Sequence, residues 1–339
     1  MNERPRHSVT EFQEWKNKPP FQCAINMGKH SVNVYSKMDH FLPYFEGLGI
    51  DYILNFPGWK TSRSPTASEY SIVYCSNPES AFYYDENIKT LLAIGKPEDY
   101  ESGQVLAYLG FWMMEAQRQT ESIFTMHSSA LAIEDKGILL LGHSGSGKTT
   151  ILLGLGSRYG CEVVSNDLTI VGHNPEVGEM ILVDGTKEIR LRLASVKTKF
   201  PGLVDLFPKS NQSPWKTKIA VAPEAIGIRS AVEPKKLSAT FLIHLDSQED
   251  YPLLAHKTEG IDIRYILYED MSRIVRGNAI SLFGADDKIL GYIPSLDNLD
   301  LHQKRVAAIE CLLSEIGVWN ISGGNLGQIC QTIYEIAKS

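Results

Sequence analysis

One short segment of the sequence carries residue types at a spacing suited to binding phosphate. Gly142, Gly147, Lys148 and Thr149 occupy the fixed positions of the pattern G-x-x-x-x-G-K-[ST]. In such a loop the glycines let the backbone curl so that successive N–H groups point at phosphate oxygens, and the following helix N-terminus adds positive charge. The lysine reaches the β- and γ-phosphates and the hydroxyl holds Mg²⁺. The alternative is a glycine-rich turn with a chance lysine, which the complete match disfavours.

The predicted nucleotide site includes the whole loop and the first helical residues. Its members are Gly142, His143, Ser144, Gly145, Ser146, Gly147, Lys148, Thr149 and Thr150. The apolar run 137–141 before the loop is typical of a buried strand, and residues 150–155 after it favour a helix. His143 is interpreted as a variable position that contributes its backbone. We therefore predict ATP and Mg²⁺ as cofactors.

A carboxylate follows the next predicted strand. Residues 163–165 are apolar or small, and Asn166 and Asp167 come directly after them. In a sheet with this kind of loop, the C-terminal end of the neighbouring strand lies beside the phosphates, where an aspartate can reach Mg²⁺. Asp167 is therefore a candidate metal ligand or base. The alternative is that Asn166 and Asp167 form a plain turn, since both residue types favour turns.

Two further groups could act on a phosphoryl group. His127 lies just ahead of the strand expected at 131–133, one hairpin before the loop, and an imidazole can exchange a proton near neutral pH. A lone histidine is more often structural. Arg190 and Arg192 share one face of an alternating segment and could stabilise transferring charge. A solvated strand face explains them equally well.

Composition excludes several classes of protein. The net charge of −7 and the pI of 5.8 disfavour broad nucleic-acid binding. The five cysteines form no CxxC pair, so no zinc site or redox motif is predicted. No apolar run reaches the ~18 residues of a membrane span, and the polar start lacks a signal region. We expect a cytoplasmic protein with neither nucleic-acid nor membrane partners.

The chain changes character along its length. Residues 21–94 contain short β-type runs, among them 24–27, 32–35, 52–54 and 71–75. Residues 100–116 favour a helix in which Trp112, Met113 and Met114 face the core. Strand and helix signals alternate from residue 123, and two helices are expected at 303–316 and 327–337. Residues 174–235 give no clear pattern. At 339 residues, about two domains are expected, 1–97 and 98–339.

Taken in order, these segments resemble one known family. The order is the sequence His-Ser-Ser-Ala at 127–130, a hairpin, the loop at 142–149, a helix ending in glycine, and a strand ending in Ser-x-Asp. This order resembles the HPr kinase/phosphorylase-like proteins, whose kinase core is related to that of ATP-dependent phosphoenolpyruvate carboxykinase. The resemblance is specific over roughly 111–171 and extends more weakly to about Leu245. It implies an α/β fold with a P-loop kinase core and a mixed central sheet, here preceded by a β-rich α+β region.

The resemblance also implies roles for individual residues. His127 corresponds to a histidine near the γ-phosphate, and Lys148 and Thr149 to phosphate and metal contacts. Asn166 and Asp167 fall on a paired-aspartate motif for metal binding and base catalysis. This sequence departs from the motif at Asn166, whose amide oxygen can ligate Mg²⁺ but cannot act as a base. Either Asp167 is the base, or His127 is, or the protein binds nucleotide without efficient transfer.

These observations predict a Mg²⁺-dependent kinase that phosphorylates a hydroxyl of a small molecule or a peptide, in a biosynthetic setting. The members of this family that act on HPr carry a further glycine-rich segment for substrate recognition. Residues 174–235 show no convincing copy of it, so HPr is a disfavoured acceptor. A carboxykinase reaction would need additional arginines and metal ligands that we do not find. The alternatives are a nucleotide-binding ATPase and a peptide-binding regulatory module without kinase activity. A homo-oligomer is compatible with the resemblance.

Overall fold

The structure is a computed structural model that describes residues 21–36, 56–100, 104–209, 211–277, 282–291 and 293–339. The chain divides into two compact units. The first comprises Met1–Arg118 and Ser272–Leu299, and the second comprises Gln119–Met271 and Asp300–Ser339. The units are defined by compactness alone, so the domain boundary expected between residues 97 and 98 stays a prediction.

The first unit contains a six-stranded mixed sheet in the order β3-β1-β2-β4-β6-β5. Its strands are β1 (Phe21–Met27), β2 (His30–Ser36), β3 (Trp59–Ser62), β4 (Ser71–Ser76), β5 (Ala81–Asp85) and β6 (Thr90–Gly95). β2, β4 and β6 run parallel, and the other pairings are antiparallel. The β-rich character expected for this region is confirmed, while the strand expected at 52–54 lies outside the described residues.

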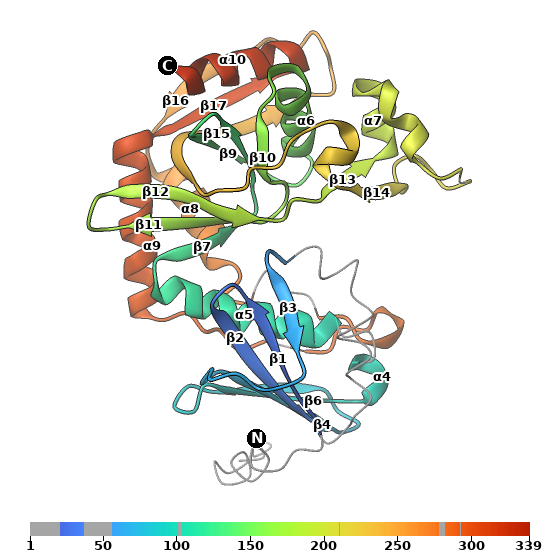
Figure 1. The fold of residues 1–339 in the computed structure, drawn as a ribbon, viewed down its shortest axis with the longest axis vertical. Coiled ribbons are helices and arrows are strands. Elements are labelled where there is room, and N and C mark those ends of the chain that lie inside the picture. The colour runs from blue at the N-terminus through green and yellow to red at the C-terminus, as the bar shows by residue number, and fades with distance from the viewer. Residues whose placement is uncertain (1–20, 37–55, 101–103, 210, 278–281, 292) are drawn as a thin grey trace. The chain divides into compact units, whose positions relative to one another are not determined.

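One long helix fills the concave side of this sheet. α4 (Pro97–Tyr100) precedes α5 (Gln104–Thr120), and the sheet curls around α5 (Figure 1). The approach is close, because a Cβ atom at Gly110 of α5 would lie 2.8 Å from Ile25 of β1. Trp112, Met113 and Met114 are fully buried, which confirms them as core residues. The short helical turn η4 (Ala285–Asp287) belongs to the same unit.

The second unit is built on a nine-stranded mixed sheet. The path is β10-β8-β9-β15-β12-β11-β7, and β17 joins β15 and carries β16 on its other side. The strands are β7 (Ile123–Met126), β8 (Ser129–Ile133), β9 (Lys136–Leu141), β10 (Glu162–Ser165), β11 (Thr169–Asn174), β12 (Glu179–Gly185), β15 (Lys235–Leu245), β16 (Leu254–Thr258) and β17 (Val318–Gly323). β15 runs parallel to β9 and β17, and the other pairings are antiparallel.

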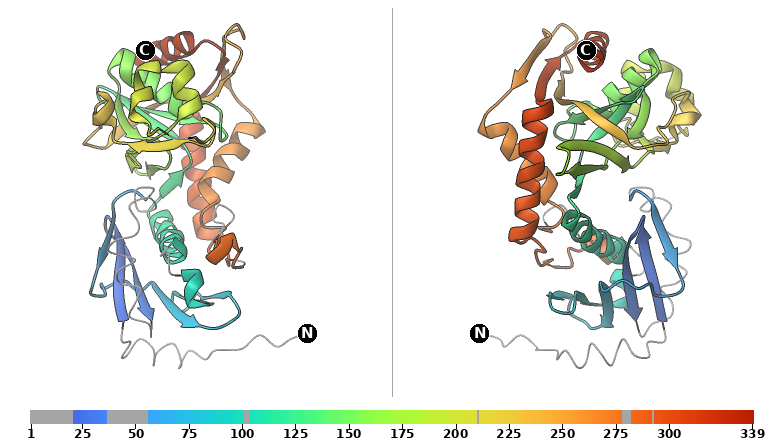
Figure 2. Two further views of the ribbon diagram at one scale, coloured as in Figure 1. Left: turned by 90° about the vertical axis from the view of Figure 1, so that its right-hand side faces the viewer. Right: turned by 60° about the vertical axis from the view of Figure 1, so that its left-hand side comes forward.

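Helices cover both faces of this sheet (Figures 1 and 2). They are α6 (Lys148–Tyr159) and α10 (Leu326–Lys338) on one face, and α8 (Ile261–Ser272) and α9 (Leu299–Cys311), extended by the π-helical turn η5 (Leu312–Ile316), on the other. Residues of β9 alternate between the two cores. Ile138 and Leu140 join the α6 side, and Leu139 and Leu141 join the α8 side. Apolar residues at all four positions 138–141 are therefore needed, because successive side chains point to opposite buried faces.

Several expected elements are confirmed and some were missed. α6 ends at Gly160, whose φ of 67° suits a glycine C-cap. The helices expected at 303–316 and 327–337 correspond to α9 with η5 and to α10. β16, β17 and α8 were not predicted. One expectation needs correction: β10 is not the direct neighbour of β9, because β8 lies between them.

The region without a clear sequence pattern contains several short elements. Besides β12 of the central sheet, they are β13 (Ile189–Arg192), α7 (Leu193–Lys199), η2 (Pro201–Leu206), β14 (Lys218–Val221) and η3 (Pro223–Ile226), and β13 and β14 form a separate two-stranded sheet. Their apolar residues pack on the core beneath α6. None of the helices in the described part of the chain combines the length and apolar character that a membrane crossing requires.

Candidate functional site

The predicted phosphate-binding segment forms a tight loop, residues 142–147, between the end of β9 and the start of α6; we call it the glycine loop. Gly142, Gly145 and Gly147 have φ values of 148°, 88° and 97°, in a region that side chains disfavour. A Cβ at Gly147 would lie 2.6 Å from the Cβ of Leu245, while one at Gly145 would meet nothing within 4 Å. The loop therefore packs against the end of β15 on one side and stays open at Gly145.

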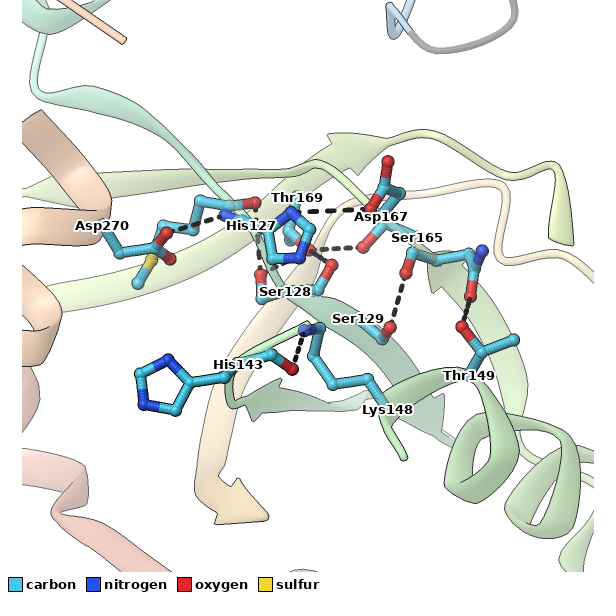
Figure 3. A network of polar contacts seen from close by, with 12 residues as sticks. His127, Ser128, Ser129, His143, Lys148, Thr149, Ser165, Asp167, Thr169 and Asp270 are labelled. Atoms are coloured by element: carbon cyan, nitrogen blue, oxygen red, sulfur yellow. Dashed lines mark hydrogen bonds and ion pairs between the residues drawn. The ribbon is translucent and has the colours of Figure 1, made fainter. Parts of the chain in front are cut away.

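The side chain of Lys148 hydrogen-bonds to the backbone of the glycine loop (Figure 3). The Nζ of Lys148 donates hydrogen bonds to the carbonyl oxygens of Gly142 and His143, at 2.7 and 3.2 Å. The N–H of Leu245 donates to the carbonyl of Ser146 and fixes the loop to β15. The Lys148 side chain is largely buried, so its ammonium group is held inside the loop.

Two features of this loop fit an incoming anion. α6 begins at Gly147 without a side-chain cap, and the first N–H groups of a helix have no partner within the helix. The hydroxyl of Ser146 is buried and, among the described residues, hydrogen-bonds to no other group. Backbone N–H groups, the helix dipole and an amino group together form a site for phosphate oxygens.

The start of α6 is joined to the end of β10 by one side-chain hydrogen bond. The Oγ1 of Thr149 donates to the Oδ1 of Asn166 at 3.0 Å, and the Nδ2 of Asn166 donates to the carbonyl of Glu188 at 3.3 Å. β10 runs parallel to β9 with β8 between them, so both strands end at the same edge of the sheet. Asn166 and Asp167 form the bend after β10, and Asn166 contacts the start of α6; the roles of the two residues in metal binding and base catalysis stay predictions.

His127 and Asp167 face one another across this edge (Figure 3). The Nδ1 of His127 lies 3.5 Å from the Oδ1 of Asp167, and both side chains are partly exposed, at 28% and 39%. The backbone N–H of His127 donates to the Oδ1 of Asp270, in the last turn of α8. Asp270 is a contact that sequence reasoning missed, because no local signal links it to His127.

Buried hydroxyl groups hold the backbone on which this pair stands. The hydroxyl of Ser129 donates to the carbonyl of Asn166, and that of Ser128 donates to Thr169. The hydroxyls of Ser165 and Thr169 also share a hydrogen bond. These four side chains are fully buried, so each hydrogen bond satisfies a polar group that water cannot reach. The small residues after His127 thus fix the end of β10 rather than line the site.

Other predicted residues lie apart from this cluster. The ring of His143 points away from Asp167 and Thr149 in Figure 3. Arg190 and Arg192 lie on the exposed face of β13, and the guanidinium of Arg192 lies 6.0 Å from the ring centre of Trp215. Their role in stabilising a phosphoryl group stays a prediction.

The residues present suit Mg²⁺, which prefers oxygen ligands and keeps several waters. The hydroxyl of Thr149 donates its hydrogen bond to Asn166, so its oxygen lone pairs remain for a metal, and Asp167, the residue after Asn166, supplies a carboxylate. Among the described residues, no group of three or more His, Cys, Asp and Glu side chains forms a metal cluster. The protein would therefore supply only a few of the Mg²⁺ ligands, and bound phosphates and water would supply the others.

Comparisons with known proteins add little. No protein-family model matches the chain, and no curated protein matches its sequence. Among solved structures, the chain is similar to the HPr(Ser) kinase/phosphatase from Coxiella burnetii, with a TM-score of 0.31 and 14% identity, over 63% of this chain and 95% of that one. At this TM-score the likeness establishes neither a shared fold nor a function.

Proposed function

We propose that the protein is an ATP- and Mg²⁺-dependent kinase that transfers the γ-phosphoryl group to a hydroxyl of a small molecule or a peptide. The observation that carries the proposal is the hydrogen bond between Thr149 and Asn166. It supports the proposal because it joins the first turn of α6, which follows a loop whose sequence and backbone suit phosphate, to the residue before Asp167, and Asp167 in turn faces His127. Phosphoryl transfer needs groups that hold the phosphates and a group that accepts the proton of the attacking hydroxyl. The loop could serve as the first and the His127–Asp167 pair as the second.

Binding of nucleotide is assigned to the glycine loop and the start of α6. Lys148, whose Nζ donates to the carbonyls of Gly142 and His143, would donate instead to the β- and γ-phosphate oxygens of a bound nucleotide. The exchange is favourable because an ammonium group hydrogen-bonds more strongly to an anionic oxygen than to a neutral carbonyl. Thr149 and Asp167 would hold Mg²⁺, which would supply positive charge to offset the negative charge that develops during transfer.

Proton transfer is assigned to the His127–Asp167 pair rather than to Asn166. Both polar atoms of the Asn166 amide are occupied, one by Thr149 and one by the carbonyl of Glu188. An amide also has no basic lone pair to offer. Asp167 faces the Nδ1 of His127 at 3.5 Å, an arrangement in which a carboxylate orients an imidazole base.

The test is to follow label from γ-³²P-ATP and Mg²⁺ incubated with the purified protein and fractions of a cell extract or a panel of hydroxylated metabolites and peptides. The matched pair of variants is Lys148→Ala, at the phosphate contact, and Lys136→Ala, at an exposed position of β9. Label on a discrete acceptor that is lost only in Lys148→Ala supports the kinase. Free phosphate without a labelled acceptor indicates an ATPase, and ATP binding without turnover indicates a regulatory module; both contradict the proposal.

A further inference from the structure

Residues 190–218 of the second unit, which we call the basic arm, concentrate positive charge on a chain whose net charge is −7. The basic residues are Arg190, Arg192, Lys197, Lys199, Lys209, Lys216 and Lys218, and Asp205 is the single acidic residue of this range. The arm comprises β13, α7, η2 and the start of β14, and it lies beside α6 (Figure 1). A surface of this sign is suited to an anionic partner.

The pairing of β13 with β14 places like charges opposite one another. Arg192 and Lys218 are partners across this antiparallel ladder, and both side chains are exposed. Like charges directly opposite one another destabilise a two-stranded sheet. In the part of the chain that the structure describes, no carboxylate forms an ion pair with either residue. The arm thus keeps a repulsive pair that an anion from outside would relieve.

The remainder of the arm holds these charges in place. Ile189 and Leu191, which alternate with the arginines, point into the core beneath α6. The N–H of Leu193 donates to the carbonyl of Thr217 and closes the ladder at 3.0 Å. Because the opposite face of β13 is buried, its charged face presents a fixed row to solvent.

An aromatic ring extends this row. Trp215 is 67% exposed, although a tryptophan of a monomeric protein is usually well covered. The guanidinium of Arg192 lies over its ring, 6.0 Å from the centre. Exposed tryptophan and arginine are the side chains most enriched at sites of protein recognition.

We propose that the exposed face of β13 and β14 binds an acidic peptide segment in an extended conformation. Arg190 and Arg192 are two residues apart on one strand face, a spacing of roughly 6.6 Å. An extended peptide presents alternate side chains at the same spacing, so its carboxylates meet the arginines in register. A single phosphate spans less than this row, and the acidic chain as a whole disfavours nucleic acid.

If the protein is a kinase as proposed, the acidic segment is part of the peptide that accepts the phosphoryl group. In this one respect the inference rests on the proposed function. The arm is connected to the candidate site at the carbonyl of Glu188, directly before β13, which accepts a hydrogen bond from Asn166. A peptide bound along β13 is therefore anchored next to the site. The small-molecule acceptor class is correspondingly disfavoured.

The experiment measures binding without nucleotide, so that its failure is distinct from a failure of the kinase proposal. A fluorescein-labelled octaglutamate peptide is titrated with the full chain and followed by fluorescence anisotropy. The variants are Arg192→Gln and Lys218→Gln. The matched control is Lys257→Gln, an exposed lysine of β16 that lies 5.8 Å from the ring centre of Trp319. The second probe is an octaglutamine peptide, and the competitor is a single-stranded oligonucleotide of equal charge.

The expected result is that each arm variant weakens octaglutamate binding by roughly 1.5- to fivefold, the scale of an exposed charge contact, while the control leaves binding unchanged. Lys218→Gln is also expected to raise the melting temperature, because the repulsion from Arg192 is removed; lost binding is then not a folding defect. Unchanged affinity in both arm variants would overturn the proposal. So would equal binding of octaglutamine, or displacement of the peptide by much lower concentrations of the oligonucleotide.

Discussion

The hydroxyl of Thr149 donates a hydrogen bond of 3.0 Å to the amide oxygen of Asn166. This contact joins the first turn of α6 to the bend after β10, two segments that are separated by a whole helix and a strand. The other end of the amide donates to the carbonyl of Glu188. Asn166 thus orients Thr149 and anchors the residue before β13, and both tasks need an amide that can accept and donate.

Asn166→Asp is expected to destabilise the fold and to leave phosphoryl transfer no faster. The carboxylate still accepts from Thr149, but it faces the carbonyl of Glu188 without a proton to donate. Loss of a buried partner of this kind costs about 1–3 kcal/mol. Urea unfolding of both proteins measures the change. A higher rate of transfer in Asn166→Asp would show instead that the native protein lacks a base at this position and that the new aspartate supplies it.

Substitution within the proton-accepting pair is expected to slow transfer while nucleotide still binds. His127→Gln and Asp167→Asn keep the size of each side chain and remove its basicity, and general base catalysis contributes roughly 10²–10⁴ in rate. Initial rates of label transfer, together with ATP affinity by calorimetry, separate the two effects. If ATP affinity falls as far as the rate does in His127→Gln, the histidine is a binding residue and the assignment is wrong.

The glycine loop is expected to tolerate a methyl group differently at Gly145 and at Gly147. Gly145→Ala and Gly147→Ala both place a side chain at positive φ, at 88° and 97°. Only at Gly147 does the new Cβ meet the Cβ of Leu245, at 2.6 Å. Steric overlap of this kind adds about 1–3 kcal/mol, so Gly147→Ala is expected to unfold at the lower temperature. Equal melting temperatures would show that the loop is not packed against β15 as described.

A buried histidine makes stability depend on pH in the acidic range. Burial lowers the pKa of His173, on β11, below its usual value of 6.5. The unfolded chain therefore binds more protons than the folded one as pH falls through 6.5, and stability is lost between that pH and the lowered pKa. His173→Leu is expected to weaken this pH dependence of urea unfolding. Its matched control is His256→Leu, at an exposed position of β16.

The local parts of the site could be predicted from the sequence. The glycine loop and α6 follow from residue types within one stretch, because glycine at positive φ and a helix start need no distant partner. The core role of Trp112 follows likewise from its apolar helix. The end of β10, which Asp167 follows, lies at the same sheet edge as the end of β9, although β8 and not β10 is the neighbour of β9; the role of Asp167 stays a prediction.

The long-range parts could not be predicted, for a physical reason. Asp270 contacts the backbone of His127 across 143 positions of the chain. The partner of the Asn166 amide is the carbonyl of Glu188, a backbone group that every residue type carries. Such contacts depend on strand register and helix placement, which single-residue patterns do not encode. The like-charge pair of Arg192 and Lys218 likewise became visible only with the register of β13 and β14.

The proposed kinase activity depends most directly on the binding of nucleotide phosphates by residues 142–149. The decisive measurement is calorimetric titration of Mg²⁺–ATP into the full chain, into Lys148→Ala and into the exposed control Lys136→Ala. Loss of one hydrogen bond to a charged group costs about 1.5–3 kcal/mol, so Lys148→Ala is expected to weaken ATP binding roughly 10- to 150-fold while Lys136→Ala binds as the parent does. Absence of ATP binding by the parent protein, or equal affinity in all three, would contradict the account.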